Sequence, residues 1–219
     1  AARQDTEGDP QRGLPSVHSD RVARPVPPCR AIIHSFQLER PGNGIAEAQP
    51  DVLLRKSPEG TPLMTSSVYF CKSWFRAKKR PTQVWSEAEA RGAHANGELY
   101  TVLVDSLERP SCFLDVTARF VGVGFLDSLL RETVTYHFSD VEDGRLFLSM
   151  ATYREFVGDS DQVSMGATYN FDHDGTVHLR RTHFLTSQVE TSTSSTDVSK
   201  NYSPKPAFGE YEDLVRLER

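Results

Sequence analysis

Three turn clusters divide the second half of the chain into short segments, and they constrain the fold more than any other feature. The clusters are Val141-Glu142-Asp143-Gly144, Gly158-Asp159-Ser160-Asp161 and Asp172-His173-Asp174-Gly175. Gly adopts a positive φ without strain, and Asp and Ser side chains bond to nearby backbone, so such clusters favour tight turns. Between them, apolar and polar residues alternate with a period of two, which is typical of half-buried strands. The segment from Glu132 to Leu185 therefore predicts an antiparallel meander of four strands.

The turns also predict how these strands pair. A type I turn followed by a left-handed Gly adds one residue to a hairpin, which fixes the pairs on both sides of an Asp-Gly turn. The pairs next to the three turns are Val141–Arg145, Phe156–Val163 and Asp172–Thr176. Further along the strands we expect Phe138–Leu148, Tyr136–Met150, Val134–Thr152, Met150–Tyr169, Thr152–Ala167, Phe171–Val177, Tyr169–Leu179 and Met165–His183.

With this register, one face of the meander is almost entirely apolar. Its apolar members are Val134, Tyr136, Phe138, Leu146, Leu148, Met150, Phe156, Val163, Met165, Ala167, Tyr169, Phe171, Val177, Leu179 and Leu185. The opposite face is mostly polar. Because a slip of one residue would scatter the apolar set over both faces, the agreement of three turns supports the register.

The rest of the chain adds strands and one or two short helices. Strands are predicted over residues 31–39, 65–76, 98–105 and 112–121, with Gly122 and Gly124 ending the last of them. A helix is predicted over 82–95 with Thr82 as its N-cap, and a shorter one over 208–217. Residues 1–28 are predicted to be a disordered N-terminal arm, because they lack an apolar stretch and end in a Pro-rich segment.

These elements predict a fold class that is mainly β, with minor α. A strongly twisted sheet of about seven or eight strands tends to curl around itself. We therefore expect residues 29–219 to form a single domain in which the antiparallel meander curls into a β-barrel or half-barrel.

The composition excludes several classes of function. A net charge of −5 and a pI near 5.8 argue against nucleic acid as the main partner, since phosphate binding needs a basic surface. The longest apolar run, Phe120–Leu126, is far shorter than the roughly 20 residues of a membrane span. No cluster has metal-ligand spacing, and we expect neither a metal nor a cofactor. Cys71 and Cys112 are interpreted as core thiols, and a cytoplasmic location is expected.

One basic cluster stands out from the acidic average. Arg76, Lys78, Lys79 and Arg80 follow the aromatic pair Trp74-Phe75. We interpret the cluster as a solvated strand end or, alternatively, as the contact for an anion or an acidic partner.

The predicted register also places polar residues on the apolar face. They are Thr152, Arg154, Arg181 and His183, with Glu132 opposite Arg154. A buried charge costs several kcal/mol unless it is paired, so a cluster of this kind needs an explanation.

Three interpretations of this cluster remain open. The residues lie at the rim of the apolar face, where Arg154 pairs with Glu132 across the strands. Alternatively, they form the polar end of an apolar pocket that binds an anionic or enolisable group. In the third interpretation His183 acts as an acid or base, with Tyr136 or Tyr169 donating a hydrogen bond.

The leading functional hypothesis is a β-barrel that binds a small molecule, with cyclase or isomerase activity as its catalytic form. The ligand would be an apolar organic molecule with an acidic or carbonyl end. The candidate catalytic residues are His183, Tyr136 and Tyr169, and the candidate substrate-binding residues are Arg154, Arg181, Glu132, Thr152, Met150 and Met165. Because the chain has no nucleophile motif, positioning and hydrogen bonding would carry such a reaction.

The alternative hypothesis is an acidic protein-binding module, such as an inhibitor or immunity-type partner of a basic protein. The net charge and the acidic turn residues would steer a basic partner onto the surface. Cavity volume distinguishes the two hypotheses. An open cavity of about 300 Å³ or more favours the small molecule, whereas a filled core favours the protein partner.

Overall fold

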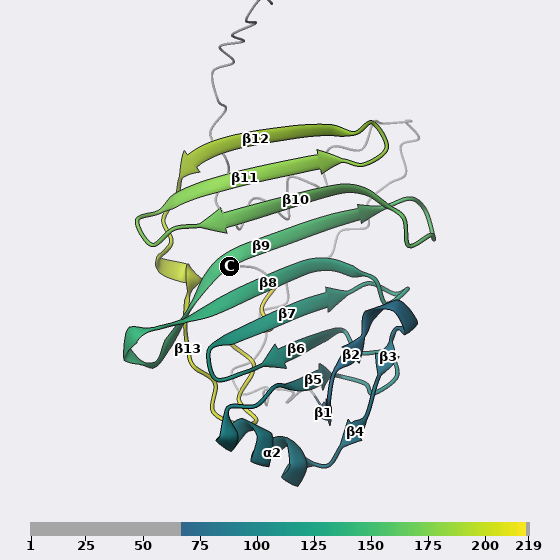
Figure 1. The fold of residues 1–219 in the computed structure, drawn as a ribbon, viewed down its shortest axis with the longest axis vertical. Helices are drawn as coiled ribbons and strands as arrows, with labels where there is room; N and C mark the ends of the chain where they lie inside the picture. The colour runs from purple at the N-terminus through teal and green to yellow at the C-terminus, as the bar shows by residue number, and fades with distance from the viewer. Residues whose placement is uncertain (1–66, 218–219) are drawn as a thin grey trace, which may run out of the picture.

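The structure, a computed structural model, describes residues 67–217, and an antiparallel sheet of 11 strands dominates them (Figure 1). The strands are β1 (Val68–Cys71), β2 (Trp74–Phe75), β3 (Arg80–Pro81), β4 (Val84–Trp85), β5 (Tyr100–Val104), β6 (Cys112–Val116), β7 (Phe120–Leu126), β8 (Glu132–Val141), β9 (Arg145–Phe156), β10 (Val163–Phe171), β11 (Thr176–His183), β12 (Gln188–Ser195) and β13 (Tyr202–Pro204). The helices are α2 (Glu87–Asn96) and the short 3-10 turns η1 (Arg76–Lys78), η2 (Glu142–Gly144) and η3 (Ser199–Asn201). The predicted arm 1–28 and the predicted strand 31–39 lie outside the described residues.

The mainly β, antiparallel class is confirmed, but the described residues do not close into a barrel. Strands β5 to β11 each pair with the next strand along the chain. The path through the sheet runs from β12 at one edge to β4 at the other, and these two edges do not pair with each other. The result is an open sheet with two faces. Within residues 67–217, no helix is long and apolar enough to cross a membrane.

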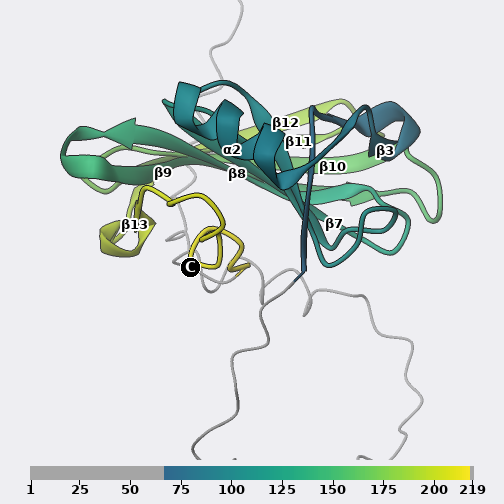
Figure 2. The ribbon, with the colours of Figure 1, turned by 90° about the horizontal axis from the view of Figure 1, so that it is seen from below.

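The main core lies on one face of the sheet, which we call the covered face. The C-terminal segment 196–217 crosses this face, while the β2–β3 hairpin lies on the opposite side of the sheet (Figure 2). Tyr211 and Leu214 of the C-terminal segment are buried in the core. The strand residues packed there include Val102, Leu114, Val121, Val123, Val134, Tyr136, Phe138, Leu146, Leu148, Met165, Ala167, Tyr169, Phe171 and Val177.

A second, smaller core forms on the other face, which we call the groove face. Its buried members are Cys71, Trp74, Leu103 and Phe113. The rings of Trp74 and Phe113 stack with their centroids 6.2 Å apart. This cluster anchors the β2–β3 hairpin to one half of the sheet. As predicted, both Cys71 and Cys112 are buried, and burial raises the pKa of each thiol to about 12.

The predicted register is confirmed next to the turns and wrong in the middle of β9. The confirmed pairs are Val141–Arg145, Phe138–Leu148, Phe156–Val163, Phe171–Val177, Tyr169–Leu179 and Met165–His183. The wrong pairs are Tyr136–Met150, Val134–Thr152, Met150–Tyr169 and Thr152–Ala167. In the structure Tyr136 and Tyr169 both pair with Ala151.

A β-bulge at Ser149 causes this difference. Phe138 pairs with Leu148 but its neighbour His137 pairs with Met150, which leaves Ser149 as an extra residue in β9. The Ser149 hydroxyl donates to the carbonyl oxygen of His137 at 3.2 Å. A second bulge, at Ser164 of β10, restores the pairing of Phe156 with Val163. Between the bulges, β9 residues that should face the covered side face the groove side instead.

The helices also differ from the predictions, for local reasons. Helix α2 begins after Ser86, which forms a capping box with Glu89, and not after Thr82. It continues through Gly92 and ends at Gly97, where φ is 70°. The predicted helix over 208–217 is absent, because Gly209 adopts a φ of 94° and interrupts the helical path. Phe208, Tyr211 and Leu214 still pack against the core through turns.

Gly122 and Gly124 lie inside β7 and do not end the preceding strand as predicted. Strand β6 ends at Val116, and β7 begins at Phe120. The Phe113 ring of β6 occupies the space beside Gly124, so that a Cβ atom there would lie 2.4 Å from Phe113 Cζ. At Gly122 the nearest atom to such a Cβ is Asp115 Cβ, at 4.0 Å.

We expect Gly124→Ala to destabilise the protein by about 1–3 kcal/mol, because the methyl group overlaps the buried Phe113 ring, which stacks on Trp74 and lies under the Arg76 guanidinium. Gly122→Ala is the matched control on the same strand, and it should change the unfolding free energy by less than about 0.5 kcal/mol. Urea unfolding of both variants measures the difference. Equal effects of the two substitutions would contradict the packing of Phe113 against Gly124.

A chain of hydrogen bonds joins α2, the sheet and the C-terminal segment. His94 Nδ1 lies 2.9 Å from the Tyr100 hydroxyl, which lies 3.0 Å from the Tyr211 hydroxyl. Burial lowers the pKa of His94, and the positive charges of Arg91 and Lys205 lower it further. The folded protein therefore favours neutral His94.

This shift gives the protein a stability that depends on pH. The contribution is complete above the unfolded-state pKa of about 6.5, and it is lost as the pH falls below that value, because the unfolded chain then binds the proton more readily. Between about pH 7.5 and pH 5, we expect the unfolding free energy to fall less steeply in His94→Gln than in the unsubstituted protein. Chemical denaturation across this range tests the prediction, and parallel curves would contradict it.

Candidate functional site

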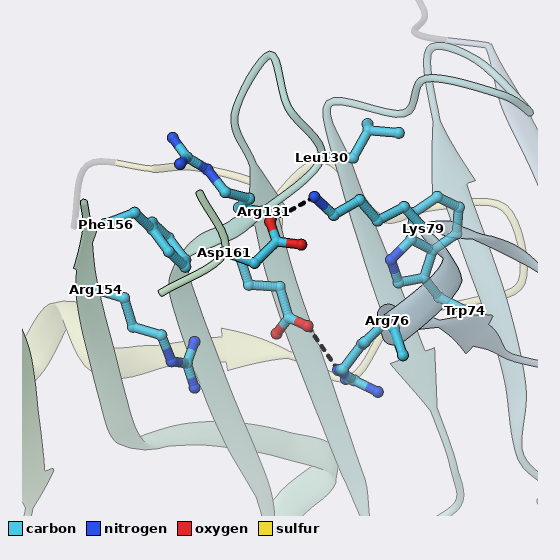
Figure 3. A pocket seen from close by; sticks show the side chains of 10 residues that line it. Trp74, Arg76, Lys79, Leu130, Arg131, Arg154, Phe156 and Asp161 are labelled. Atoms are coloured by element: carbon cyan, nitrogen blue, oxygen red, sulfur yellow. Dashed lines mark hydrogen bonds and ion pairs between the residues drawn. The ribbon is translucent and has the colours of Figure 1, made fainter. Parts of the chain in front are cut away.

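A groove opens on the groove face between the β2–β3 hairpin and strands β8 and β9 (Figure 3). Its larger part has a volume of about 350 Å³ and is lined by Trp74, Arg76, Ala77, Lys79, Leu130, Arg131, Glu132, Arg154, Phe156 and Asp161. A hollow of about 220 Å³ shares Arg76, Glu132 and Arg154 with it and extends over β7. We refer to both parts together as the groove.

The floor of the hollow is low because β7 carries glycines there. Gly122 pairs with Asp115 on one side and with His137 on the other, and His137 pairs with Met150. A residue with a side chain at Gly122 would fill the space between these neighbours. The missing side chain therefore gives the hollow its depth.

Ion pairs hold the hairpin side of the groove in place. Arg76 Nε lies 2.7 Å from Glu132 Oε1, and Arg76 Nη2 donates to Asp115 Oδ2 at 3.2 Å. The buried hydroxyl of Thr101 donates to Asp115 Oδ1 at 2.6 Å. The guanidinium of Arg76 also lies over the Phe113 ring, 4.9 Å from its centroid. Arg76 is thus positioned by two carboxylates and a ring.

The loop end of the groove is also fully paired. Lys79 Nζ contacts Asp161 Oδ1 at 2.6 Å, and Arg131 binds Asp127 Oδ2 at 2.7 Å. Arg131 Nη1 donates to the carbonyl oxygens of Gly158 and Ser160 as well. Burial raises the pKa of Asp127, but hydrogen bonds from Arg131 and Leu129 outweigh it and hold the pKa below its ordinary value.

Arg154 differs from the other cations of the groove. Its Nη1 is buried, and no hydrogen-bond acceptor lies within reach of this atom in the part of the chain that the structure describes. The guanidinium groups of Arg154 and Arg76 lie on opposite sides of the groove (Figure 3). A buried N–H donor without an acceptor costs free energy. It therefore favours the binding of an acceptor from outside the described residues.

Three of the candidate substrate-binding residues from the sequence meet in this groove, and a fourth lies on the same face. Glu132, Met150 and Arg154 line the groove. Thr152 also lies on the groove face, where it pairs with Thr135 and Thr168. The prediction that these residues share the apolar face with Arg181 and His183 is wrong. The bulge at Ser149 turns this part of β9 over, and a separate irregularity at Thr133 of β8 displaces Glu132.

The remaining candidates lie on the covered face. Met165, Arg181 and His183 form neighbouring pairs there, and Arg181 and His183 both contact Glu190, at 3.4 and 3.7 Å. Tyr169 is buried in the main core. Tyr136 borders the hollow, but its hydroxyl donates to the carbonyl oxygen of Leu217 at 2.6 Å. The structure therefore divides the predicted cluster between two faces.

Sequence reasoning missed the aromatic wall of the groove. Trp74 and Phe113 belong to two predicted strands for which no pairing was predicted, so the contact between their rings was not predicted either. The basic cluster after Trp74-Phe75 was a usable signal, because two of its members, Arg76 and Lys79, line the groove. In the described residues, both cations contact carboxylates of the protein itself.

Comparison with known proteins gives no match. No protein-family model, curated protein sequence or solved structure is significantly similar to this chain.

We expect Arg154→Met to leave the unfolding free energy unchanged or to raise it by up to about 2 kcal/mol, because the substitution removes a buried donor without a partner. Arg131→Met is the contrasting variant, and it should cost at least about 2 kcal/mol, since Asp127 and two carbonyl groups lose their donor. Urea unfolding compares the two. A loss in Arg154→Met as large as that in Arg131→Met would show that Arg154 stabilises the fold.

Proposed function

We propose that this protein binds a small organic molecule with an apolar body and an anionic or carbonyl end, and that the groove is its binding site. The observation that carries the proposal is the buried, unpaired Nη1 of Arg154 at a cavity of about 350 Å³. A ligand oxygen that accepts from this atom would form a charge-assisted hydrogen bond and remove the cost of the unpaired donor. The cavity is in the range of small-molecule sites.

The walls of the groove support an apolar and partly aromatic ligand body. Trp74, Phe156 and Leu130 line the larger part, and Phe113 and Met150 line the hollow. Apolar and aromatic walls with a few fixed polar groups are typical of sites for small organic molecules. Arg154 is the residue that would bind the anionic or carbonyl end of the ligand, because Arg76, Lys79 and Arg131 already have carboxylate partners.

The proposal is one of binding, and the cyclase or isomerase hypothesis has less support. Its candidate acid or base, His183, lies on the covered face beside Glu190. The hydroxyl of Tyr136 is bonded to the backbone of Leu217, and Tyr169 is buried in the core. Glu132 is the candidate acidic group in the groove, but Arg76 holds it as an ion pair. The proposed site is a groove on an open sheet, whereas the sequence predicted a site inside a barrel.

The hypothesis of an acidic protein-binding module is not favoured by the placement of the acidic turns. Glu142 and Asp143 lie in the β8–β9 turn, and Asp172 and Asp174 lie in the β10–β11 turn at the same end of the sheet (Figure 1). Asp161 lies in the β9–β10 turn, at the other end. The negative charge is divided between two ends and does not form one docking surface.

Two dyes with the same aromatic body test the proposal. 1-Anilinonaphthalene-8-sulfonate carries an anionic group, and N-phenyl-1-naphthylamine lacks it. We expect the protein to bind both, and Arg154→Met to weaken binding of the sulfonate about tenfold or more, which corresponds to one charge-assisted hydrogen bond. Binding of the neutral amine should be unchanged. Fluorescence titration gives the dissociation constants.

Arg119→Met is the control, because Arg119 is an exposed residue of the turn between β6 and β7 and does not line the groove. It should bind both dyes like the unsubstituted protein. If Arg154→Met binds the sulfonate as tightly as the control, Arg154 is not the anchor. If the unsubstituted protein binds neither dye, the groove is not a site for ligands of this class.

A further inference from the structure

Strand β12 forms one edge of the sheet and is unusually regular. All eight of its residues pair with β11 without a bulge, from His183–Gln188 to Thr176–Ser195. Six of the eight are exposed, and only Ser192 and Ser194 are partly covered. The outer side of β12 has no partner strand among residues 67–217.

The hydrogen-bond pattern identifies which groups of β12 face outward. The backbone of Asp172 bonds to Thr176, and that of Phe184 bonds to Ser164, so even-numbered β11 residues bond to β10. Because bonding direction alternates along a strand, odd-numbered β11 residues bond to β12, where their partners are even-numbered. The N–H and C=O groups of Val189, Thr191, Thr193 and Ser195 therefore point away from the sheet.

This edge lacks the features that keep sheet edges apart. Proteins protect such edges with Pro, Lys, inward charges, bulges or short strands. Strand β12 has no Pro and no Lys, and Glu190 is its single charged residue. Glu190 is held by Arg181 on the neighbouring strand, at 3.4 Å. The β-branched residues Thr191 and Thr193 and the exposed Val189 favour extended pairing.

The opposite edge of the sheet cannot serve as the partner of β12. Strand β4 has two residues, and helix α2 follows it closely. A contact between β12 of one molecule and β4 of the next would therefore be very short. A contact between two β12 strands is self-complementary and closes after two copies.

We propose that two copies of this chain pair through their β12 strands in an antiparallel, two-fold symmetric manner, so that the two sheets form one continuous sheet. Outward-facing residues must pair with one another, and the register that pairs all four places Thr191 of one copy opposite Thr193 of the other and Val189 opposite Ser195. Glu190 then lies opposite Ser194, so the carboxylates of the two copies do not face each other. The contact is one strand wide, which predicts a weak dimer with a Kd between about 1 μM and 1 mM.

The first experiment is sedimentation equilibrium of the full chain over this concentration range, with the double variant Thr191→Lys, Thr193→Lys. In the proposed register each new lysine faces a lysine of the other copy, so we expect the Kd to rise at least about tenfold. The double variant Gln162→Lys, Asn170→Lys is the control, because it adds the same charge at exposed positions away from the edge. It should dimerise like the unsubstituted protein.

Amide hydrogen exchange provides a measurement that does not depend on a variant. Dimerisation should protect the amides of Thr191 and Thr193 more strongly as the protein concentration rises, while those of Ser192 and Ser194 are protected throughout by β11. A monomer at all concentrations overturns the proposal, and so does a dimer that the lysines at positions 191 and 193 do not weaken. Protection of Thr191 and Thr193 in a monomer would show that another part of the same chain covers the edge.

Discussion

One extra residue in β9 decides where the functional groups of this protein lie. Ser149 has no paired residue in β8. In the part of β9 that follows it, each side chain faces the opposite side of the sheet from the one predicted for a regular strand. This reversal sends Ala151 and Tyr153 toward the main core and Met150 and Arg154 to the groove. Without the bulge, Arg154 would lie on the covered face beside the residues that pair with Glu190.

Nearly all the charged side chains of the groove form ion pairs within the protein. Arg76, Lys79 and Arg131 each contact a carboxylate that is fixed in turn by further hydrogen bonds or by the fold. Against this background the unpaired Nη1 of Arg154 is the exception that needs an explanation. In the function that we propose, a ligand oxygen accepts from this atom, and removing the cost of the unpaired donor contributes to the binding energy.

The two faces of the sheet are stabilised in different ways, and this difference leaves the groove open. The covered face is closed by the C-terminal segment, which Tyr211 ties to Tyr100 and through it to His94 of α2. On the groove face, the β2–β3 hairpin is held by Trp74 against Phe113 and by Arg76, and Leu107, Leu126 and Leu130 pack against the same small core. The hairpin covers one half of this face, and its edge forms one wall of the groove.

The sequence by itself determined the four strands of the meander between residues 132 and 185, their turns and the register next to each turn, because turn chemistry and a period of two are local properties. It also determined the polar residues that needed a partner, among them Arg154 and Glu132. Only the tertiary structure decided that Arg154 shares a groove with Trp74 and Phe113 and not with His183. A single serine in a strand does not indicate a β-bulge, so the sequence could not predict the one at Ser149. The approach of β2 to β6 depends on contacts between distant parts of the chain. Both features are stabilised by packing between strands, and this packing forms only when the whole sheet has formed.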